Sequence, residues 1–139
     1  LLADTLNSLA EKRLSPDKVR SDPVEMNKFK EDISAIFLST IQTFDLRSGW
    51  IVFDSKNING ENVVSFSKDK NGTWKKEPEY DTTTLKPEEN AWWVVPSEKG
   101  ATNWSKEYFW EPWEMNIITY SKPFKAGGEL LGVVGSEFV

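Results

Sequence analysis

The stretch "MNIITYSKPFKAGGELLGVVGSEF", Met115 to Phe138, decides the fold. Two runs rich in β-branched and aromatic residues flank "KAGGE", whose adjacent glycines are typical of a tight turn. The first run is expected to end at Pro123, and the second to begin at Leu130. The pattern therefore predicts a β-hairpin near the end of the chain.

The second strand of this hairpin carries apolar residues on both faces. Strict alternation divides it into two sets, with Leu130, Val134 and Phe138 on one face and Leu131, Val133, Glu137 and Val139 on the other. A strand that is apolar on both sides is typical of the centre of a sheet that is covered on both faces.

Upstream, "DPVEMNKFKEDISAIFLSTIQTF" predicts a long helix ending near Phe44. Asp22 is expected to be the N-cap, with Pro23 at the first helical position and Glu25 completing a capping box. Helical spacing predicts one apolar face, made of Phe29, Ile33, Ile36, Phe37, Thr40, Ile41 and Phe44. An earlier helix is expected from the spacing of Leu2, Leu6, Leu9 and Leu14, followed by a break at "SPDKVRSDP".

Between the long helix and the hairpin, the sequence predicts further strands and a short helix. "SGWIVFDS" and "NVVSFSKD" read as strands, and "TWKKEP" returns as a hairpin arm after the turn "KNG". A short helix is expected around residues 87–94, closed by Pro96 and Gly100. The prediction is one α+β domain over residues 1–139, with a helical region at 1–45 and a mostly antiparallel five-stranded sheet with helical and loop insertions at 46–139.

Composition excludes several classes of function. A net charge of −5 argues against nucleic-acid binding, because phosphates require a basic surface. The absence of Cys and His excludes disulfides, thiolate nucleophiles, His-based triads and ordinary zinc sites, so no metal or cofactor is expected. The chain begins with Leu1 and ends on strand-like residues, so we expect it to be part of a longer protein whose membrane helices lie outside it.

Five of the seven tryptophans lie between residues 92 and 113, in a segment rich in loops. Tryptophan often packs in cores, but a loop seldom supplies so many core residues. Aromatic walls bind sugars, flat rings and ammonium groups, the last through cation–π attraction of about 0.5–2 kcal/mol. The cluster favours a ligand pocket over core packing.

Acidic residues near this cluster leave two alternatives open. Glu111 and Glu114 could form the carboxylate pair of a glycosidase, or they could be solvated acids on a loop, as the intervening Pro112 favours. Glu137 could be exposed to solvent at a frayed strand end, or its carboxylate could be the counter-charge for a cationic ligand group.

The C-terminal half, from about Asn90 to Val139, resembles the Cache sensor domains, the PAS-like, PDC-type extracytoplasmic modules of prokaryotic membrane receptors. The resemblance rests on "AWWVVPSEKG", "NWSKEY", "TYSKP" and "GVVGSE" in this order and spacing. It implies a PAS-like sheet, a small-molecule ligand, no catalytic residues and an extracytoplasmic location. It also implies signalling through flanking helices, in a receptor whose output is a histidine kinase, a chemoreceptor signalling domain, a diguanylate cyclase or a phosphatase, and a homodimer through the N-terminal helices.

In amino-acid-sensing members, an R-x-W-Y element, a downstream Tyr and a closing-strand Asp form the pocket. The matching positions, with Trp110 added from the loop wall, make the expected ligand site Asn90, Trp92, Trp93, Tyr108, Trp110 and Glu137. Asn90 replaces the Arg that would clamp a ligand carboxylate, which turns the prediction towards an amine or quaternary ammonium ligand. The alternatives are a carbohydrate-binding module, a structural dimerisation domain without ligand, and a small carboxylate-dependent hydrolase.

Overall fold

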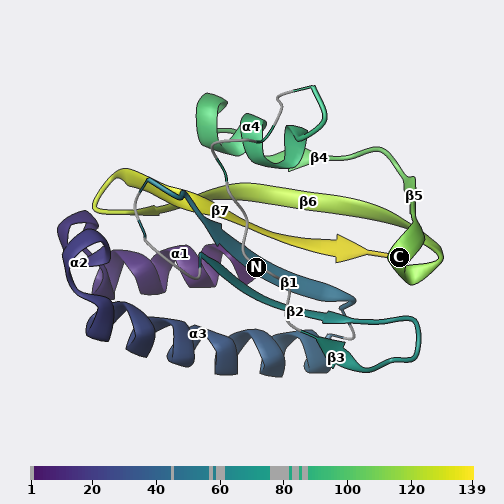
Figure 1. The fold of residues 1–139 in the computed structure, drawn as a ribbon, viewed down its shortest axis with the longest axis horizontal. Coiled ribbons are helices and arrows are strands. Elements are labelled where there is room, and N and C mark those ends of the chain that lie inside the picture. Colours follow the sequence, from purple (N-terminus) through teal and green to yellow (C-terminus); the bar gives the residue numbers. More distant parts are fainter. Residues whose placement is uncertain are drawn as a thin grey trace.

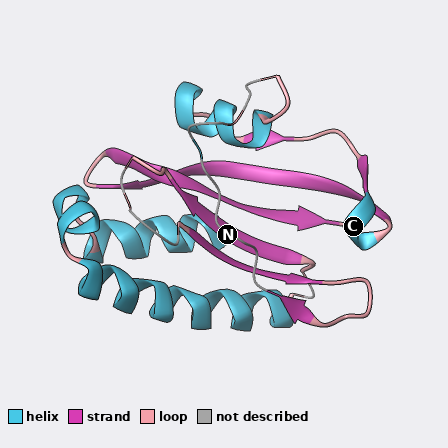
Figure 2. Cartoon of the chain, in the orientation of Figure 1, coloured by secondary structure: helices cyan, strands magenta, loops and turns pink. Residues whose placement is uncertain are grey.

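One antiparallel sheet separates a layer of three helices from a layer formed by a short helix and loops (Figure 1). The computed structural model describes residues 2–44, 46–56, 58, 62–75, 82, 85 and 88–139. The three helices at the N-terminal end all lie on one face of the sheet, and the short helix lies beyond the other face (Figure 2). The α+β class expected from the sequence is confirmed.

The helical layer consists of α1 (Leu2–Arg13), α2 (Pro16–Ser21) and α3 (Pro23–Thr43). Asp22 is the N-cap of α3, and its Oδ1 accepts a hydrogen bond from the backbone N–H of Glu25 at 3.1 Å. The reciprocal half of a capping box is absent, because the N–H of Asp22 donates to the carbonyl of Lys18. α2 lies where the sequence predicted a break, although Ser15 caps it in the usual way and Pro16 opens it.

α3 buries one side against the sheet, as its spacing predicted. The buried residues are Met26, Phe29, Ile33, Phe37 and Ile41. Phe44, expected on this face, is 60% exposed because it is the C-cap residue, where the helical path has ended. The expectation for Phe44 was therefore wrong.

The sheet follows the order β3-β2-β1-β7-β6-β4, with β5 paired to β6, and each of these pairings is antiparallel. The strands are β1 (Ser48–Phe53), β2 (Val63–Lys68), β3 (Trp74–Lys75), β4 (Asn103–Trp104), β5 (Tyr108–Trp110), β6 (Met115–Ala126) and β7 (Glu129–Phe138). The five predicted strands are all present, and β4 and β5 are short additions beside β6. β7 lies between β1 and β6, so the inference of a central strand is confirmed.

The predicted end of the first hairpin strand was wrong. β6 does not stop at Pro123 but continues to Ala126, because β4 pairs with β6 only at Tyr120 and Ser121. Beyond Ser121, β6 is an edge strand, where a missing N–H is tolerated. The carbonyl of Pro123 accepts a hydrogen bond from the side chain of Asn7 in α1.

A β-bulge in β7 overturns part of the face assignment. Phe124 pairs with Gly132 but Lys125 pairs with Leu130, so Leu131 is an extra residue in the ladder. Past this point the alternation shifts by one residue. Leu131 therefore joins Val134 in the core beneath the helices, instead of sharing a face with Val133.

The short helix α4 (Ala91–Lys99) is displaced from its predicted position. It begins four residues after Pro87, which lies outside the described residues, and it continues through Pro96 to Lys99. Gly100 ends it in the left-handed conformation with φ of 63°, which glycine adopts without steric cost.

Close approach of α3 to the sheet depends on Gly49 in β1. A Cβ at this position would lie 2.9 Å from Cδ1 of Phe37, which is closer than packed carbons approach. One face of β1 is therefore covered by the core that lies between the helices and the sheet. On the opposite face of β1, a second and smaller apolar cluster consists of Trp50, Val52, Trp93 and Val133.

Candidate ligand-binding site

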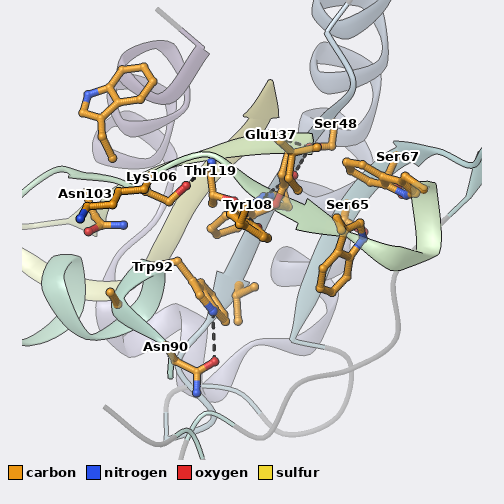
Figure 3. Close-up of a pocket in the computed structure, with 18 of the residues that line it drawn as sticks. Ser48, Ser65, Ser67, Asn90, Trp92, Asn103, Lys106, Tyr108, Thr119 and Glu137 are labelled. Carbon is orange, nitrogen blue, oxygen red and sulfur yellow. Dashed lines mark hydrogen bonds between the residues drawn. The ribbon is translucent and has the colours of Figure 1, made fainter. Parts of the chain in front are cut away.

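A cavity of about 640 Å³ is lined by residues on the face of the sheet opposite the helical core, among them Trp50 and Val52. This volume is within the range of pockets that bind small molecules, about 300–1,000 Å³. β1, β2, β6 and β7 form its floor, and residues 89–92, 103–106, 108, 110 and 113 contribute to its walls (Figure 3). Its polar floor residues include Ser48, Ser65, Ser67, Thr119 and Glu137.

The indole of Trp50 covers part of the floor, and Gly135 makes room for it. The two residues are direct cross-strand partners. A Cβ at Gly135 would lie 2.3 Å from Cζ2 of Trp50 and 2.5 Å from the carbonyl oxygen of Tyr120. Only a residue without a side chain fits there, so Gly135 fixes the path of the indole across the sheet.

Glu137 is positioned by hydrogen bonds from neutral donors in β1. Nε1 of Trp50 donates to both carboxylate oxygens, at 2.9 and 3.0 Å, and the hydroxyl of Ser48 also donates to the carboxylate. The Ser48 hydroxyl oxygen in turn accepts the backbone N–H of Glu137 at 2.9 Å. These contacts hold the carboxylate against the floor, where Glu137 is only half-buried and lines the cavity.

The wall next to this carboxylate is aromatic. Trp92 lies edge-on to Trp50, with ring centroids 5.3 Å apart. Its Nε1 donates to Oδ1 of Asn90 at 3.2 Å, so Asn90 orients the indole instead of capping α4 with its side chain (Figure 3). This arrangement presents the ring of Trp92 to the cavity.

Tyr108 is tied to the floor at Thr119. The two hydroxyl groups are 2.7 Å apart, and Thr119 is buried in β6. Ser105 anchors the loop before β5, because its hydroxyl accepts the N–H of Thr119 at 2.8 Å and its N–H donates to the Thr119 carbonyl at 2.9 Å. The loop that carries Tyr108 therefore has a defined position over the sheet.

The segment after β5 closes one side of the cavity. It forms the turn η2 (Glu111–Trp113), in which Trp113 is buried and lines the cavity. The guanidinium carbon of Arg47 lies 5.1 Å from the ring centroid of Trp113, a cation–π contact. Glu111 and Glu114 are both exposed, and neither lines the cavity. The carboxylate pair considered for a hydrolase therefore does not face this pocket.

Five of the six residues predicted for the ligand site line this one cavity: Asn90, Trp92, Tyr108, Trp110 and Glu137. Trp93 does not. It is buried, and it packs beneath Trp92 with ring centroids 6.0 Å apart, because successive residues of a helix point in different directions. Their role in binding remains a prediction.

Sequence reasoning missed Trp50 and the serines of the floor. Ser48 and Trp50 lie in a strand in which every residue is buried, so no polar alternation marked one face as a site. Ser65 and Ser67 alternate with the buried Val64 and the half-buried Phe66, and this small polar face was the available signal. Ser67 and Glu137 are 70 residues apart in the chain, so the sequence alone did not show that the two line the same pocket.

The described residues include no group of three or more acidic side chains that could hold a metal ion. The cavity instead combines one positioned carboxylate with aromatic walls and hydroxyl groups. Such a site can bind a ligand. Among the described residues, two acids line the cavity: Glu137 on the floor and the exposed Glu89 just before α4.

Residues 33–138 match the family model for the methyl-accepting chemotaxis protein-like, first PDC sensor domain. This chain belongs to that family of PDC sensor domains. The match extends from the middle of α3 to the end of β7, so it includes the second half of α3 and the whole sheet. The resemblance read from the sequence is confirmed.

Solved structures of sensor domains share this PDC fold. The sensory domain of the Campylobacter jejuni chemoreceptor Tlp3 superposes with a TM-score of 0.66 at 14% identity, covering 99% of this chain and 50% of that one. The same domain in complex with L-valine gives a TM-score of 0.63 at 14% identity, covering 99% and 49%. The extracellular domain of soHK1S-Z6, named as a histidine kinase, gives 0.61 at 20% identity, covering 99% and 56%.

The chain spans about half the length of these solved sensor domains. A search of curated protein sequences finds no relative of it. In the part of the chain that the structure describes, none of the helices combines the length and apolar character needed to cross a bilayer.

Proposed function

We propose that this PDC sensor domain is the extracytoplasmic, ligand-binding part of a membrane receptor and that its ligand carries a cationic amine or quaternary ammonium group. The receptor relatives support the first half of the proposal, since they include a chemoreceptor sensory domain and an extracellular domain named for a histidine kinase. The cavity on the free face of the sheet supports the second half.

The observation that carries the proposal is the position of Glu137. Its carboxylate lies at the cavity floor, oriented by the neutral donors Trp50 and Ser48, with the aromatic wall beside it. A cation bound here is stabilised by attraction to the carboxylate and by cation–π interactions of about 0.5–2 kcal/mol per aromatic face. An anionic ligand would instead be repelled at this end of the cavity.

The chain of contacts from Glu137 also reaches the helical layer. Ser48 follows α3 after a short connection, and Gly49 lies directly against Phe37 of α3. A ligand that favours one arrangement of the floor would shift the population of α3 positions by its differential affinity. We infer that signalling proceeds through this shift, without a chemical reaction in the domain.

A thermal-shift screen tests the proposal with primary amines, quaternary ammonium compounds, amino acids, organic acids and sugars. At a free concentration of about 100 times Kd, a specific ligand adds about 2.7 kcal/mol, a rise in melting temperature of about 10 °C for a domain of this size. We expect ammonium compounds to produce this rise. A rise with sugars or organic acids but none with ammonium compounds would sink the assignment.

The isosteric variant Glu137→Gln is the matched test of the carboxylate. A glutamine keeps an acceptor for Trp50 but removes the charge, so the domain should fold and lose at least tenfold in affinity for the ammonium compound. Glu98→Gln, on the exposed side of α4, is the control and should bind as the wild type does.

A further inference from the structure

Two tripeptides of the chain have the form Asn-X-Ser/Thr that N-glycosylation requires, "NGT" at residues 71–73 and "NWS" at residues 103–105. Such tripeptides also occur by chance, so the pattern does not by itself make either one a site. The fold places the two in different surroundings. The first lies between β2 and β3, and the second begins in β4, which is paired with β6.

The first tripeptide forms the tip of the β2–β3 turn, where Asn71, Gly72 and Thr73 are all exposed. Asp69 holds this turn through the backbone. Its Oδ1 accepts the N–H groups of Asn71 and Thr73, each at 2.9 Å, and its own N–H donates to the Thr73 carbonyl at 2.9 Å. The turn is therefore stabilised without the side-chain amide of Asn71 or the hydroxyl of Thr73.

The space around this tip is open. A Cβ at Gly72 would have no described residue other than its chain neighbours within 4 Å. Exposed turn tips of this kind are where a protein is most accessible to modifying enzymes. An enzyme can therefore approach residues 71–73 while the domain stays folded.

The second tripeptide is held in the sheet. Asn103 is half-buried and pairs with Ser121 in β6. The Ser105 hydroxyl accepts the N–H of Thr119 at 2.8 Å, and the Ser105 N–H donates to the Thr119 carbonyl at 2.9 Å. An enzyme that reads this hydroxyl must first separate the segment from β6.

We propose that Asn71 is an N-glycosylation site and that Asn103 is not. The side-chain nitrogen of Asn71 attacks the anomeric carbon of an oligosaccharide that a membrane oligosaccharyltransferase presents on a lipid pyrophosphate. The new C–N bond forms as the bond from that carbon to the pyrophosphate oxygen breaks. The lipid pyrophosphate leaves with the electron pair, and the amide nitrogen loses one proton to a base of the enzyme.

This inference goes beyond the proposed function and rests on one part of it, the extracytoplasmic location at which such transfer occurs. It does not depend on the ligand, because Asn71 does not line the cavity. β3 ends the sheet order and begins at Trp74, three residues after Asn71. A bulky, hydrated glycan beside an edge strand hinders pairing of that edge with another chain.

Glycan transfer to the folded full chain tests the proposal. The reagents are a lipid-linked oligosaccharide and a purified single-subunit oligosaccharyltransferase that requires only Asn-X-Ser/Thr. Peptide mass spectrometry gives the initial rate at each asparagine, which is divided by the rate for a synthetic peptide of the same sequence. This ratio removes the enzyme's own preference between the two tripeptides. Thr73→Val keeps Asn71 and removes the hydroxyl, and Thr5→Val, at an exposed position of α1, is the control.

We expect the folded chain to receive one glycan, at Asn71, about as fast as the matching peptide does. Asn103 should react at least about tenfold more slowly in the folded chain than in its peptide, because β4 must first open. Thr73→Val should receive no glycan at Asn71, and Thr5→Val should behave as the wild type does.

An unmodified Asn71 in the folded chain would overturn the proposal, and so would zero occupancy of Asn71 in the receptor purified from its own membrane. Transfer to Asn103 at the rate of its peptide would overturn the exclusion of that site. Calorimetry of the glycosylated chain with tetramethylammonium should give the affinity of the unmodified chain. Because this binding is measured separately, failure of the ammonium proposal is distinguishable from failure of the glycosylation proposal.

Discussion

At the scale of single residues, the pocket depends on a glycine rather than on a functional group. Gly135 has no Cβ, and this lets the indole of Trp50 lie across β7 so that its N–H reaches Glu137. The orientation of the carboxylate is thus set by a position that carries no polar side chain. Residues that shape the site therefore extend beyond those that face the ligand.

Gly135→Ala tests this dependence. The added methyl group would meet Trp50 and the backbone of Tyr120 at 2.3–2.5 Å, so the indole must shift. We expect a loss of about 1–3 kcal/mol in the free energy of unfolding, as for overpacked cores, measured by urea denaturation. The folded variant should also bind ammonium ligands more weakly, because Trp50 no longer holds Glu137.

Gly72→Ala is the matched control for the cavity, since no described residue other than its chain neighbours lies within 4 Å of a Cβ at Gly72. Gly72 has a φ of 79°, so its variant carries backbone strain but no clash near the cavity. It should lose stability and keep its affinity. If Gly135→Ala kept the wild-type affinity, the indole would not be what positions the carboxylate.

At the scale of elements, α1 is attached to β6 by polar contacts along its length. Asp4 forms an ion pair with Lys122, and the side chain of Asn7 donates to the Pro123 carbonyl and accepts the N–H of Lys125 at 3.1 Å. These contacts lie at the edge strand that β4 leaves uncovered. The helix therefore covers the part of β6 that would otherwise be exposed to another strand.

The Asp4–Lys122 pair predicts a pH dependence of stability. The Lys122 ammonium lowers the pKa of Asp4 below 3.8, and Asp4 raises the pKa of Lys122 above 10.5. For Asp4, the stabilisation is present above the unfolded pKa near 3.8 and is lost as the pH falls through the lower folded pKa. For Lys122, it is present below 10.5 and is lost as the pH rises through the higher folded pKa.

We expect Asp4→Asn to make the free energy of unfolding less dependent on pH below about pH 4, measured by urea denaturation across a pH series. The change should be small, because Asp4 lies on the surface. Glu31→Gln, on the exposed side of α3, should leave the acid limb of the curve as it is in the wild type. An Asp4→Asn curve that overlays the wild type would show that the pair contributes nothing in solution.

At the scale of the whole molecule, the sheet separates stability from recognition. The larger core lies between the sheet and α1 to α3, which cover one face of the sheet (Figure 1). The cavity is lined by strand residues of the other face, by the start of α4 and by residues of the segment from β4 to η2. Phe37 is fully buried in the first layer, while Tyr108 and Trp110 are about 40% exposed in the second. The two layers share only the strands between them.

This separation predicts opposite effects for substitutions on the two faces. Phe37→Ala should cost about 3–5 kcal/mol of stability and change the affinity of the folded fraction much less than a substitution in the cavity wall does. Trp110→Ala should change stability by less than about 1 kcal/mol and remove most of the ligand-induced rise in melting temperature. Urea denaturation and titration calorimetry of both variants measure the two effects, and a Trp110→Ala variant with wild-type affinity would contradict the prediction.

Local patterns in the sequence were sufficient to predict most of the helices and strands. The cap at Asp22, the helical spacing from Phe29 to Ile41 and the "KAGGE" turn each depend on neighbours a few residues away, so α3, β6 and β7 were predicted nearly as they are. The placement of Glu137 on the same face as Val133 followed from period-2 alternation alone. Of the five expected site residues that line the cavity, the family resemblance indicated Asn90, Trp92, Tyr108 and Glu137, and the aromatic cluster indicated Trp110.

Tertiary structure decided what depends on how the strands pair with one another. The bulge at Leu131 is defined only by the register against β6, and the continuation of β6 through Pro123 depends on where β4 stops. Trp50 and Lys106 became cavity residues because the sheet order places β1 beside β7 and the β4–β5 loop over the same floor. Short-range patterns contain no term for such pairings, since the free energy that selects them comes from burial between whole segments, which for β1 and β7 lie about 80 residues apart.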